Sequence, residues 1–141
     1  MKKNMITATL LLLCASQFVI ADTRAEIVLV VNKANTQKLS DEQMTEIFLG
    51  KSKSFPNGSK AVAVMVDFKA DGLDAFLSSR FGKSISQYRS YWSRLMFSGE
   101  GVPPQTYNNG KDVVDLVGRN PDLIGITDSS FVNDSVRVIT R

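Results

Sequence analysis

The stretch from Leu39 to Lys51 constrains the fold most, because both ends of a short helix are encoded in it. Ser40 is a suitable N-cap, since its hydroxyl can accept a hydrogen bond from a backbone N–H that has no partner inside the helix. Gln43 follows three residues later and completes a capping box. Gly50 suits the left-handed position that commonly follows a helix. The apolar residues at helical spacing between these signals are Met44, Ile47 and Phe48.

Apolar runs of strand length lie on both sides of this helix. Residues 26–32 form a nearly continuous β-branched run, which is typical of a strand that is buried on both faces. Residues 61–66 form a second apolar run, preceded by the turn signal Pro56-Asn57-Gly58. The order of strand, helix and strand predicts a parallel βαβ unit.

The second half of the chain continues this alternation. Helices are predicted over residues 73–81, 85–97 and 111–118, and strands over residues 105–107, 123–127 and 136–139. Together these elements predict a three-layer α/β domain, with a mainly parallel sheet flanked by helices. In such folds ligands collect at the carboxyl ends of the strands, beside helix N-termini.

The helix predicted at residues 85–97 presents large apolar side chains at helical spacing. They are Ile85, Tyr88, Trp92, Leu95 and Met96. Such a stripe can stack against a ligand, but it more often packs into the core. We therefore expect this face of the helix to be buried.

The N-terminus has the pattern of an export signal. Two lysines precede an apolar run over residues 5–20, and Val19-Ile20-Ala21 places tolerated residues at the −3 and −1 positions of a cleavage site. We expect residues 1–21 to be a cleaved signal and residues 22–141 to be one periplasmic domain, with cleavage after Ala25 as the alternative. The apolar run is shorter than the roughly 20 residues that span a bilayer, which disfavours a permanent anchor.

Cysteine, histidine and charge each exclude functions. The one cysteine, Cys14, follows Leu13 rather than the small residue typical of lipoprotein signals, and cleavage after Ala21 removes it.

The chain has no histidine, which excludes Ser-His-Asp catalysis and histidine-ligated zinc. Of 17 basic and 14 acidic residues, two basic ones lie in the signal, so the mature domain is nearly neutral and does not suit nucleic acid. We expect neither an enzyme nor a cofactor.

Three segments resemble the phosphate-binding proteins of ABC importers. Residues 39–51 are similar to that family's L-(S/T)-x-x-x-(L/I)-x-x-I-F-x-G-K segment. Residues 91–104 resemble a block of its short, single-domain relatives, with Tyr-Trp-Ser-Arg-Leu, Phe-Ser-Gly-Glu-Gly and Pro-Pro in that order. Residues 120–128 resemble its (N/T)-P-G-A-I-G-Y-(V/A) strand. The resemblance covers about residues 27–139.

The resemblance implies one lobe of a type 2 periplasmic binding protein. Full-length members have two lobes joined by two crossing strands, and the ligand is held between the lobes. The mature chain is long enough for one lobe only, with residues 27–32 and 136–139 as its hinge-side strands.

The resemblance also implies where an anion would bind. Full-length phosphate binders carry a turn of the type R-S-D-G-S-G-T at a helix N-terminus, and residues 67–73 correspond to it. Asp71 and Gly72 match the D-G of that turn, while Lys69 would replace its arginine as a point charge without the bidentate fork. No Ser or Thr follows Gly72, and the Asp71 carboxylate could instead cap the helix and compete with an anion.

A second turn lies where the family's other phosphate-facing helix begins. It consists of Asn108, Asn109 and Gly110. These residues either contribute donors to an anion or serve as an N-cap and a turn. The sequence leaves both interpretations open.

Two functions are compatible with these features. The first is an exported solute-binding protein that holds phosphate or a similar oxyanion for an ABC importer, with the importer's permease as its partner. Its candidate binding residues are Lys69, Asp71, Gly72, Asn108, Asn109 and Gly110. A single lobe would offer an open shelf where water screens the charges, unless a second copy closes over it as a homodimer. The alternative is a non-transporting envelope protein that uses the lobe as an interaction module for another exported or membrane protein.

Overall fold

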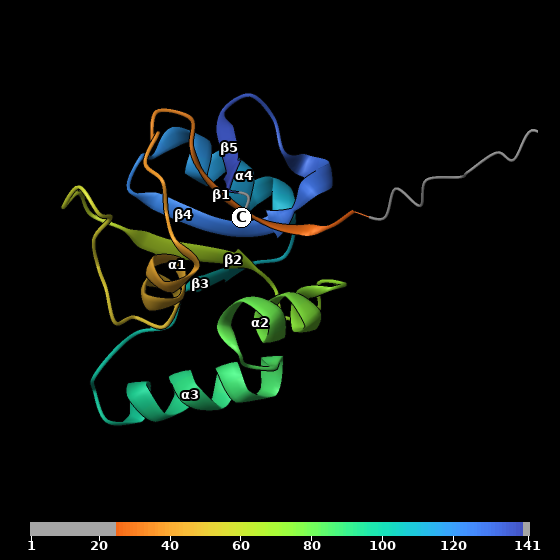
Figure 1. The fold of residues 1–141 in the computed structure, drawn as a ribbon. Helices are drawn as coiled ribbons and strands as arrows, with labels where there is room; N and C mark the ends of the chain where they lie inside the picture. Colours follow the sequence, from red (N-terminus) through yellow and green to blue (C-terminus); the bar gives the residue numbers. More distant parts are fainter. Residues whose placement is uncertain (1–24, 140–141) are drawn as a thin grey trace, which may run out of the picture.

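Residues 25–139 are described by the computed structural model shown in Figure 1. The predicted export signal, its cleavage after Ala21 and the lipoprotein reading of Cys14 lie outside these residues. The elements are β1 (Ile27–Asn32), α1 (Asp41–Phe48), β2 (Val62–Val66), α2 (Leu73–Phe81), α3 (Ile85–Phe97), β3 (Gln105–Tyr107), α4 (Gly110–Arg119), β4 (Leu123–Asp128), the short 3₁₀ helix η1 (Ser129–Phe131) and β5 (Val136–Ile139). Every predicted helix and strand is present, with bounds that differ by a residue or two.

The five strands form one mixed sheet in the order β3-β2-β4-β1-β5. β2 pairs in parallel with β3 and β4, whereas β1 pairs antiparallel with β4 and with β5. Four strands therefore run in one direction and β1 runs against them. The predicted three-layer α/β architecture is confirmed, with a parallel half at β3-β2-β4 and an antiparallel half at β4-β1-β5.

The prediction of a parallel βαβ unit at the start of the chain is wrong. β4 lies between β1 and β2, which run in opposite directions. The apolar run of β1 requires burial on both faces, and two antiparallel neighbours under helices provide that burial as well as parallel ones do. The pattern of apolar residues therefore indicates that β1 is buried, but it does not indicate the direction of the strand.

Helices cover both faces of the sheet, with α1, α2 and α3 on one side and α4 on the other (Figure 1). Gly125 in β4 allows α4 to approach closely, because a Cβ there would lie 2.7 Å from a methyl carbon of Val113 and 3.0 Å from one of Val117. The buried residues of all these elements form one apolar core cluster.

α1 and α3 begin with the capping boxes that their sequences predict. The Ser40 hydroxyl accepts the Gln43 N–H at 3.2 Å, and the Gln43 side-chain oxygen accepts the Ser40 N–H at 2.9 Å. Ser84 and Gln87 make the same reciprocal pair in front of α3. Two backbone donors that the helix itself cannot satisfy are thus paired at each N-terminus.

Two tyrosines of α3 attach it to the end of α1. The Tyr88 hydroxyl donates to the Phe48 carbonyl at 2.8 Å, and the Tyr91 hydroxyl donates to the Leu49 carbonyl at 2.7 Å. Carbonyls at a helix C-terminus have no partner within the helix, so these hydroxyls satisfy them. Burial raises the pKa of Tyr88, and the nearby Trp92 side chain lowers it by less. The buried Trp92 N–H has no hydrogen-bond partner among the described residues.

The apolar stripe of α3 is buried only in part. Tyr88 and Trp92 are buried and pack edge to face, with ring centroids 6.5 Å apart, which confirms core packing for these two residues. Met96 is 51% exposed, so its predicted burial is wrong, and Phe97 beside it is 97% exposed. Met96 lies at the margin of the buried face, near the C-terminal end of α3.

Candidate functional site

The carboxyl ends of β2, β3 and β4 meet at one edge of the sheet, toward the right of Figure 1, and we call this the carboxyl edge. It consists of residues 67–72 after β2, residues 108–110 after β3, and residues 128–129 at the end of β4. The Asp67 N–H donates to the Tyr107 carbonyl at 2.8 Å and holds the first two turns together. The structure therefore brings both sets of predicted site residues to the same edge.

The turn before α2 exposes its side chains. The Asp67 carboxylate accepts the Lys69 N–H at 2.9 Å, which shapes the turn. Gly72 is the N-cap of α2 with φ of +81°, a left-handed conformation that favours glycine. The Asp71 side chain does not cap the helix, so that alternative is wrong: the glycine between Asp71 and Leu73 takes the cap position instead. The Lys69 ammonium pairs with no carboxylate among residues 25–139.

The turn before α4 is largely structural. The Asn109 side-chain oxygen accepts the Asp112 N–H at 2.9 Å and its amide donates to the Asp112 carboxylate at 3.1 Å, so Asn109 is the N-cap. Gly110 is buried, and its carbonyl accepts the Thr127 hydroxyl at 2.9 Å. A Cβ on Gly110 would lie 2.6 Å from that hydroxyl oxygen. Of the three predicted residues, Asn108 has the exposed side chain without an assigned structural partner in the described part of the chain.

Backbone donors at two helix N-termini lie at the carboxyl edge. In α2 the N–H groups of Asp74 and Ala75, and in α4 the N–H of Lys111, have no acceptor among the described residues. Such groups, together with the positive end of the helix dipole, favour an anion. The site therefore has donors from two elements and one unpaired cation, Lys69.

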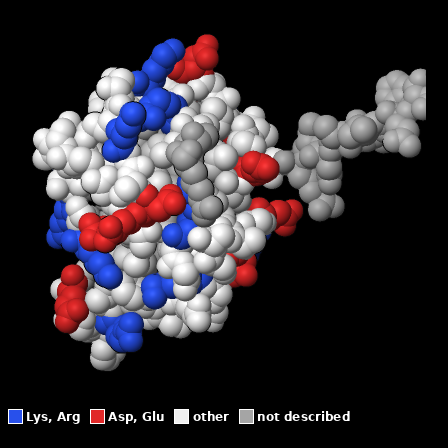
Figure 2. Space-filling model, in the orientation of Figure 1, with Lys and Arg blue, Asp and Glu red and all other residues white. Residues whose placement is uncertain are grey.

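Five carboxylates belong to the turns of this edge or to the first turns of the two helices. They are Asp67, Asp71, Asp74, Asp112 and Asp128. Lys111 does not offset them, because its ammonium lies 2.7 Å from Asp115; the hydrogen bond between the two raises the pKa of Lys111 and lowers that of Asp115. On the face shown in Figure 2, basic and acidic side chains are interspersed without a continuous field of one sign. An anion at the carboxyl edge must therefore compete with local negative charge, which sequence reasoning recognised only at Asp71.

A hollow of about 490 Å³ lies at the opposite edge of the sheet, where β2, β3 and β4 begin. Its lining includes Val62, Trp92, Val102, Pro103 and Pro104. It is separate from the predicted site residues, which sit on an open surface, as expected for a single lobe. Among residues 25–139 no group of carboxylate, cysteine or histidine side chains suits a metal ion, and no helix is long and apolar enough to cross a membrane.

The mixed sheet, its two helical layers and its open carboxyl edge are the architecture of one lobe of a periplasmic binding protein. Solved structures bear this out. The chain superposes with a TM-score of 0.60 and 22% identity on a protein of Clostridium perfringens assigned as a phosphate ABC transporter substrate-binding protein, solved with bound phosphate. The TM-score is 0.59, with 21% identity, for an ABC-type phosphate transport receptor from Vibrio cholerae. It is 0.56, with 8% identity, for PstS from Borrelia burgdorferi.

These matches establish the fold of a single lobe. They cover 80%, 80% and 81% of this chain but 43%, 44% and 46% of the respective neighbours, so the chain spans less than half of their length. No protein-family model and no curated protein sequence matches the chain. The resemblance to phosphate-binding proteins of ABC importers is thus confirmed at the level of architecture.

Proposed function

We propose that this protein is an exported solute-binding protein whose lobe holds phosphate, or a similar oxyanion, at the carboxyl edge for delivery to an ABC importer. The observation that carries the proposal is that α2 and α4 both begin, with unpaired backbone N–H groups, at the edge that also bears Lys69. Support comes from a structural neighbour that was solved with bound phosphate.

The proposed binding mode follows from the chemistry of the edge. The free N–H groups of α2 and α4 would donate to the oxyanion, the Asn108 amide would add a donor, and Lys69 would supply charge. Gly72 is exposed and has no side chain to obstruct an approach to the backbone of its turn, whereas Gly110 is packed against Thr127. The Asp71 carboxylate would accept the O–H of a protonated phosphate, which sulfate lacks at neutral pH.

Binding to a single copy should be weak. The edge is open to water, which screens Lys69, and the neighbouring carboxylates oppose an anion. A second copy facing this edge would exclude water and take the place of the missing lobe. We therefore expect millimolar affinity for the monomer and tighter binding by a closed homodimer.

Isothermal titration of residues 22–141 with phosphate tests the proposal. We expect saturable heat in the millimolar range, its loss in Lys69→Met, and its retention in Lys33→Met, which removes an exposed lysine from another part of the surface. Sulfate at the same ionic strength should bind more weakly. Absence of heat above buffer dilution, or equal losses in both variants, would reject an anion site at this edge.

The carboxylates around the edge favour a second candidate function. Asp74 and Asp112 already occupy the first turns of α2 and α4, and the Asn109 side chain is committed to its cap. In this alternative, the protein's own acidic residues neutralise the positive ends of α2 and α4, no anion binds there, and the lobe serves as an interaction module for another envelope protein. A pulldown from envelope extract that recovers only a transporter permease would count against this alternative.

A further inference from the structure

The segment from residue 75 to residue 99 differs in charge from the rest of the chain. It contains four basic residues and no acidic one, whereas the chain outside the predicted signal is nearly neutral. The basic residues are Arg80, Lys83, Arg89 and Arg94. This segment forms most of α2 and all of α3, so the excess of positive charge falls on one layer of the fold.

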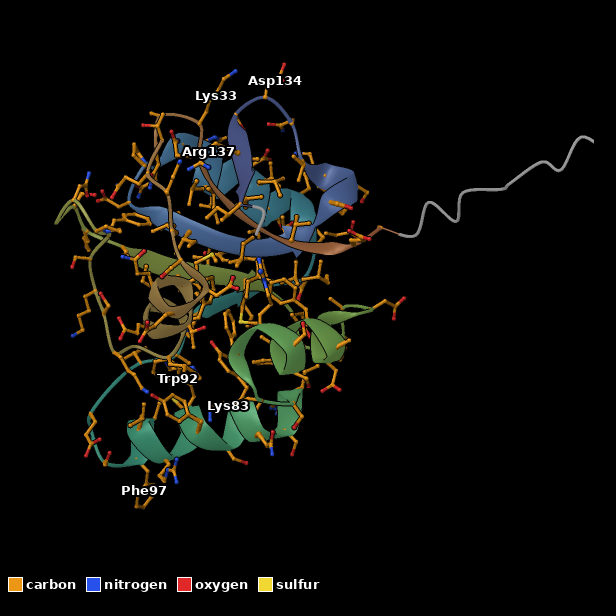
Figure 3. All side chains as sticks on the ribbon, viewed as in Figure 1. Lys33, Lys83, Trp92, Phe97, Asp134 and Arg137 are labelled. Atoms are coloured by element: carbon orange, nitrogen blue, oxygen red, sulfur yellow. The ribbon has the colours of Figure 1, made fainter. Side chains whose placement is uncertain are left out.

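α3 is the outermost element of that layer (Figure 1). Its inner side carries the buried Tyr88 and Trp92. Its outer face consists of six exposed residues: Ser86, Arg89, Ser90, Ser93, Arg94 and Phe97. In Figure 3, Trp92 points from α3 toward α1, whereas Phe97 points away from the rest of the molecule. A fully exposed phenylalanine thus projects from a face that is otherwise cationic and hydroxyl-bearing.

The cations of this face are not neutralised by carboxylates. Arg80 is the exception in the segment, because it pairs with Asp41 at 2.9 Å and its side chain is only 12% exposed. The Arg89 guanidinium lies 5.5 Å from the centre of the Phe68 ring, a contact that leaves its charge intact. Arg94 has no carboxylate partner among the described residues.

Two shallow hollows flank the serines of this face. One is lined by Ile85, Ser86, Arg89, Ser90 and Ser93. The other is lined by Lys83, Ser86, Gln87, Ser90, Tyr91 and Arg94. Each hollow combines hydroxyl donors with at least one cation, which is the donor chemistry that phosphate diester groups require.

We propose that the outer face of α3 docks the protein on the surface of a bilayer that contains anionic phospholipids. Arg89 and Arg94 would meet lipid phosphates on either side of Phe97, whose ring would enter the boundary between headgroups and acyl chains. Met96, 51% exposed, precedes Phe97 in the chain and lies at the margin of this face. A second copy fits this face less well, since pairing α3 with itself would oppose arginine to arginine. The inference does not depend on phosphate binding at the carboxyl edge.

Docking of this kind is weak, reversible and sensitive to salt. A cation close to an anionic membrane surface changes binding by roughly fivefold, and this effect is screened at high ionic strength. Removing both arginines should therefore lower the partition coefficient on the order of 25-fold. Removing the Phe97 ring should also lower the partition coefficient, but binding should remain sensitive to salt.

Co-sedimentation with vesicles tests the proposal. Residues 22–141 are mixed with vesicles of phosphatidylcholine alone or with added phosphatidylglycerol, at low salt and at high salt. We expect binding only with phosphatidylglycerol and at low salt, a large loss in Arg89→Gln with Arg94→Gln, and a loss in Phe97→Ser. The matched control, Lys33→Gln with Lys38→Gln, removes the same charge from exposed positions, and Lys33 lies at the end of the molecule opposite α3 (Figure 3).

Each other result overturns the proposal. No binding to anionic vesicles, equal binding to neutral ones, or an equal loss in the lysine control would show that α3 is not a specific docking face. A Phe97-dependent dimer without vesicle binding would show that the face serves another copy instead. Circular dichroism and the fluorescence of the single tryptophan establish that each variant is folded.

Discussion

At the scale of single residues, the contact between Gly50 and Trp92 shows how closely α1 and α3 approach. Gly50 has φ of +71°, and a Cβ there would lie 2.5 Å from a ring carbon of Trp92. The glycine after α1 therefore has two roles: it permits the left-handed turn, and it leaves room for the indole. The sequence indicates the first role, since glycine commonly follows a helix. The second depends on a residue 42 positions away, which only the folded chain brings near.

Gly50→Ala should lower the free energy of unfolding by about 3 kcal/mol, because left-handed strain adds to overpacking against Trp92. Gly58→Ala is the matched control: its φ is +85°, but nothing lies within 4 Å of a Cβ there. Gly58→Ala should lower the free energy of unfolding by about 1 kcal/mol, because it adds left-handed backbone strain without overpacking. Urea unfolding followed by circular dichroism measures both values. Equal losses in the two variants would contradict a packing role for Gly50.

Tyr88 should make the fold sensitive to alkaline pH. Burial raises its pKa above the ordinary value of 10.0. The unfolded tyrosine ionises near that value while the folded one does not, so this contribution to stability is present below about pH 10 and is lost as the pH rises further. The loss should approach about 1.4 kcal/mol per pH unit.

Urea unfolding of the wild type and of Tyr88→Phe, from neutral pH to about pH 11, measures this contribution. The variant should be less stable at neutral pH, because the Phe48 carbonyl loses its donor, but its stability should fall less steeply in alkali. Identical slopes for the two proteins would rule out Tyr88 as the cause.

At the scale of elements, the helices were predictable because their end signals are local. The capping boxes at Ser40 and Ser84 involve residues three apart, and both are present as hydrogen-bonded pairs. The strands were predictable as apolar runs, but the direction of β1 was not, since pairing partners are chosen across the whole chain. The alternative that Asp71 caps α2 is wrong for a local reason, because the left-handed Gly72 lies between Asp71 and the first residue of the helix.

Removal of either cap should cost about 1 kcal/mol of stability. Ser40→Ala and Ser84→Ala are expected to add in the double variant, because the two caps share no hydrogen-bond partners. Ser78→Ala, at an exposed position inside α2, serves as the control and should change stability by less than about 0.5 kcal/mol. A double variant that loses no more than a single one would contradict additivity, and no loss in either single variant would show that the helices form independently of their caps.

At the scale of the whole molecule, the described residues form one apolar core that corresponds to one lobe of the structural neighbours. The chain spans less than half of its structural neighbours, and its carboxyl edge is open. If the proposed anion site works by closure between two copies, phosphate should promote dimers. Sedimentation velocity in phosphate and in chloride of equal ionic strength measures this effect. If the protein is monomeric in both solutions, closure between two copies is excluded, and phosphate could bind only weakly, at the open carboxyl edge of a single copy.

The sequence by itself determined the elements, the core-facing residues of α1, the two capping boxes and the resemblance to a binding-protein lobe, because each depends on residue types at short, fixed spacings. Only the tertiary structure decided that β1 runs against its neighbours, that Gly50 makes room for Trp92, and that Phe97 stands free on a cationic face. It also decided the character of the candidate site, by gathering Lys69, two helix N-termini and five carboxylates from separate segments onto one edge. Charges distant in sequence interact only when the topology places them together, and no local pattern records that placement.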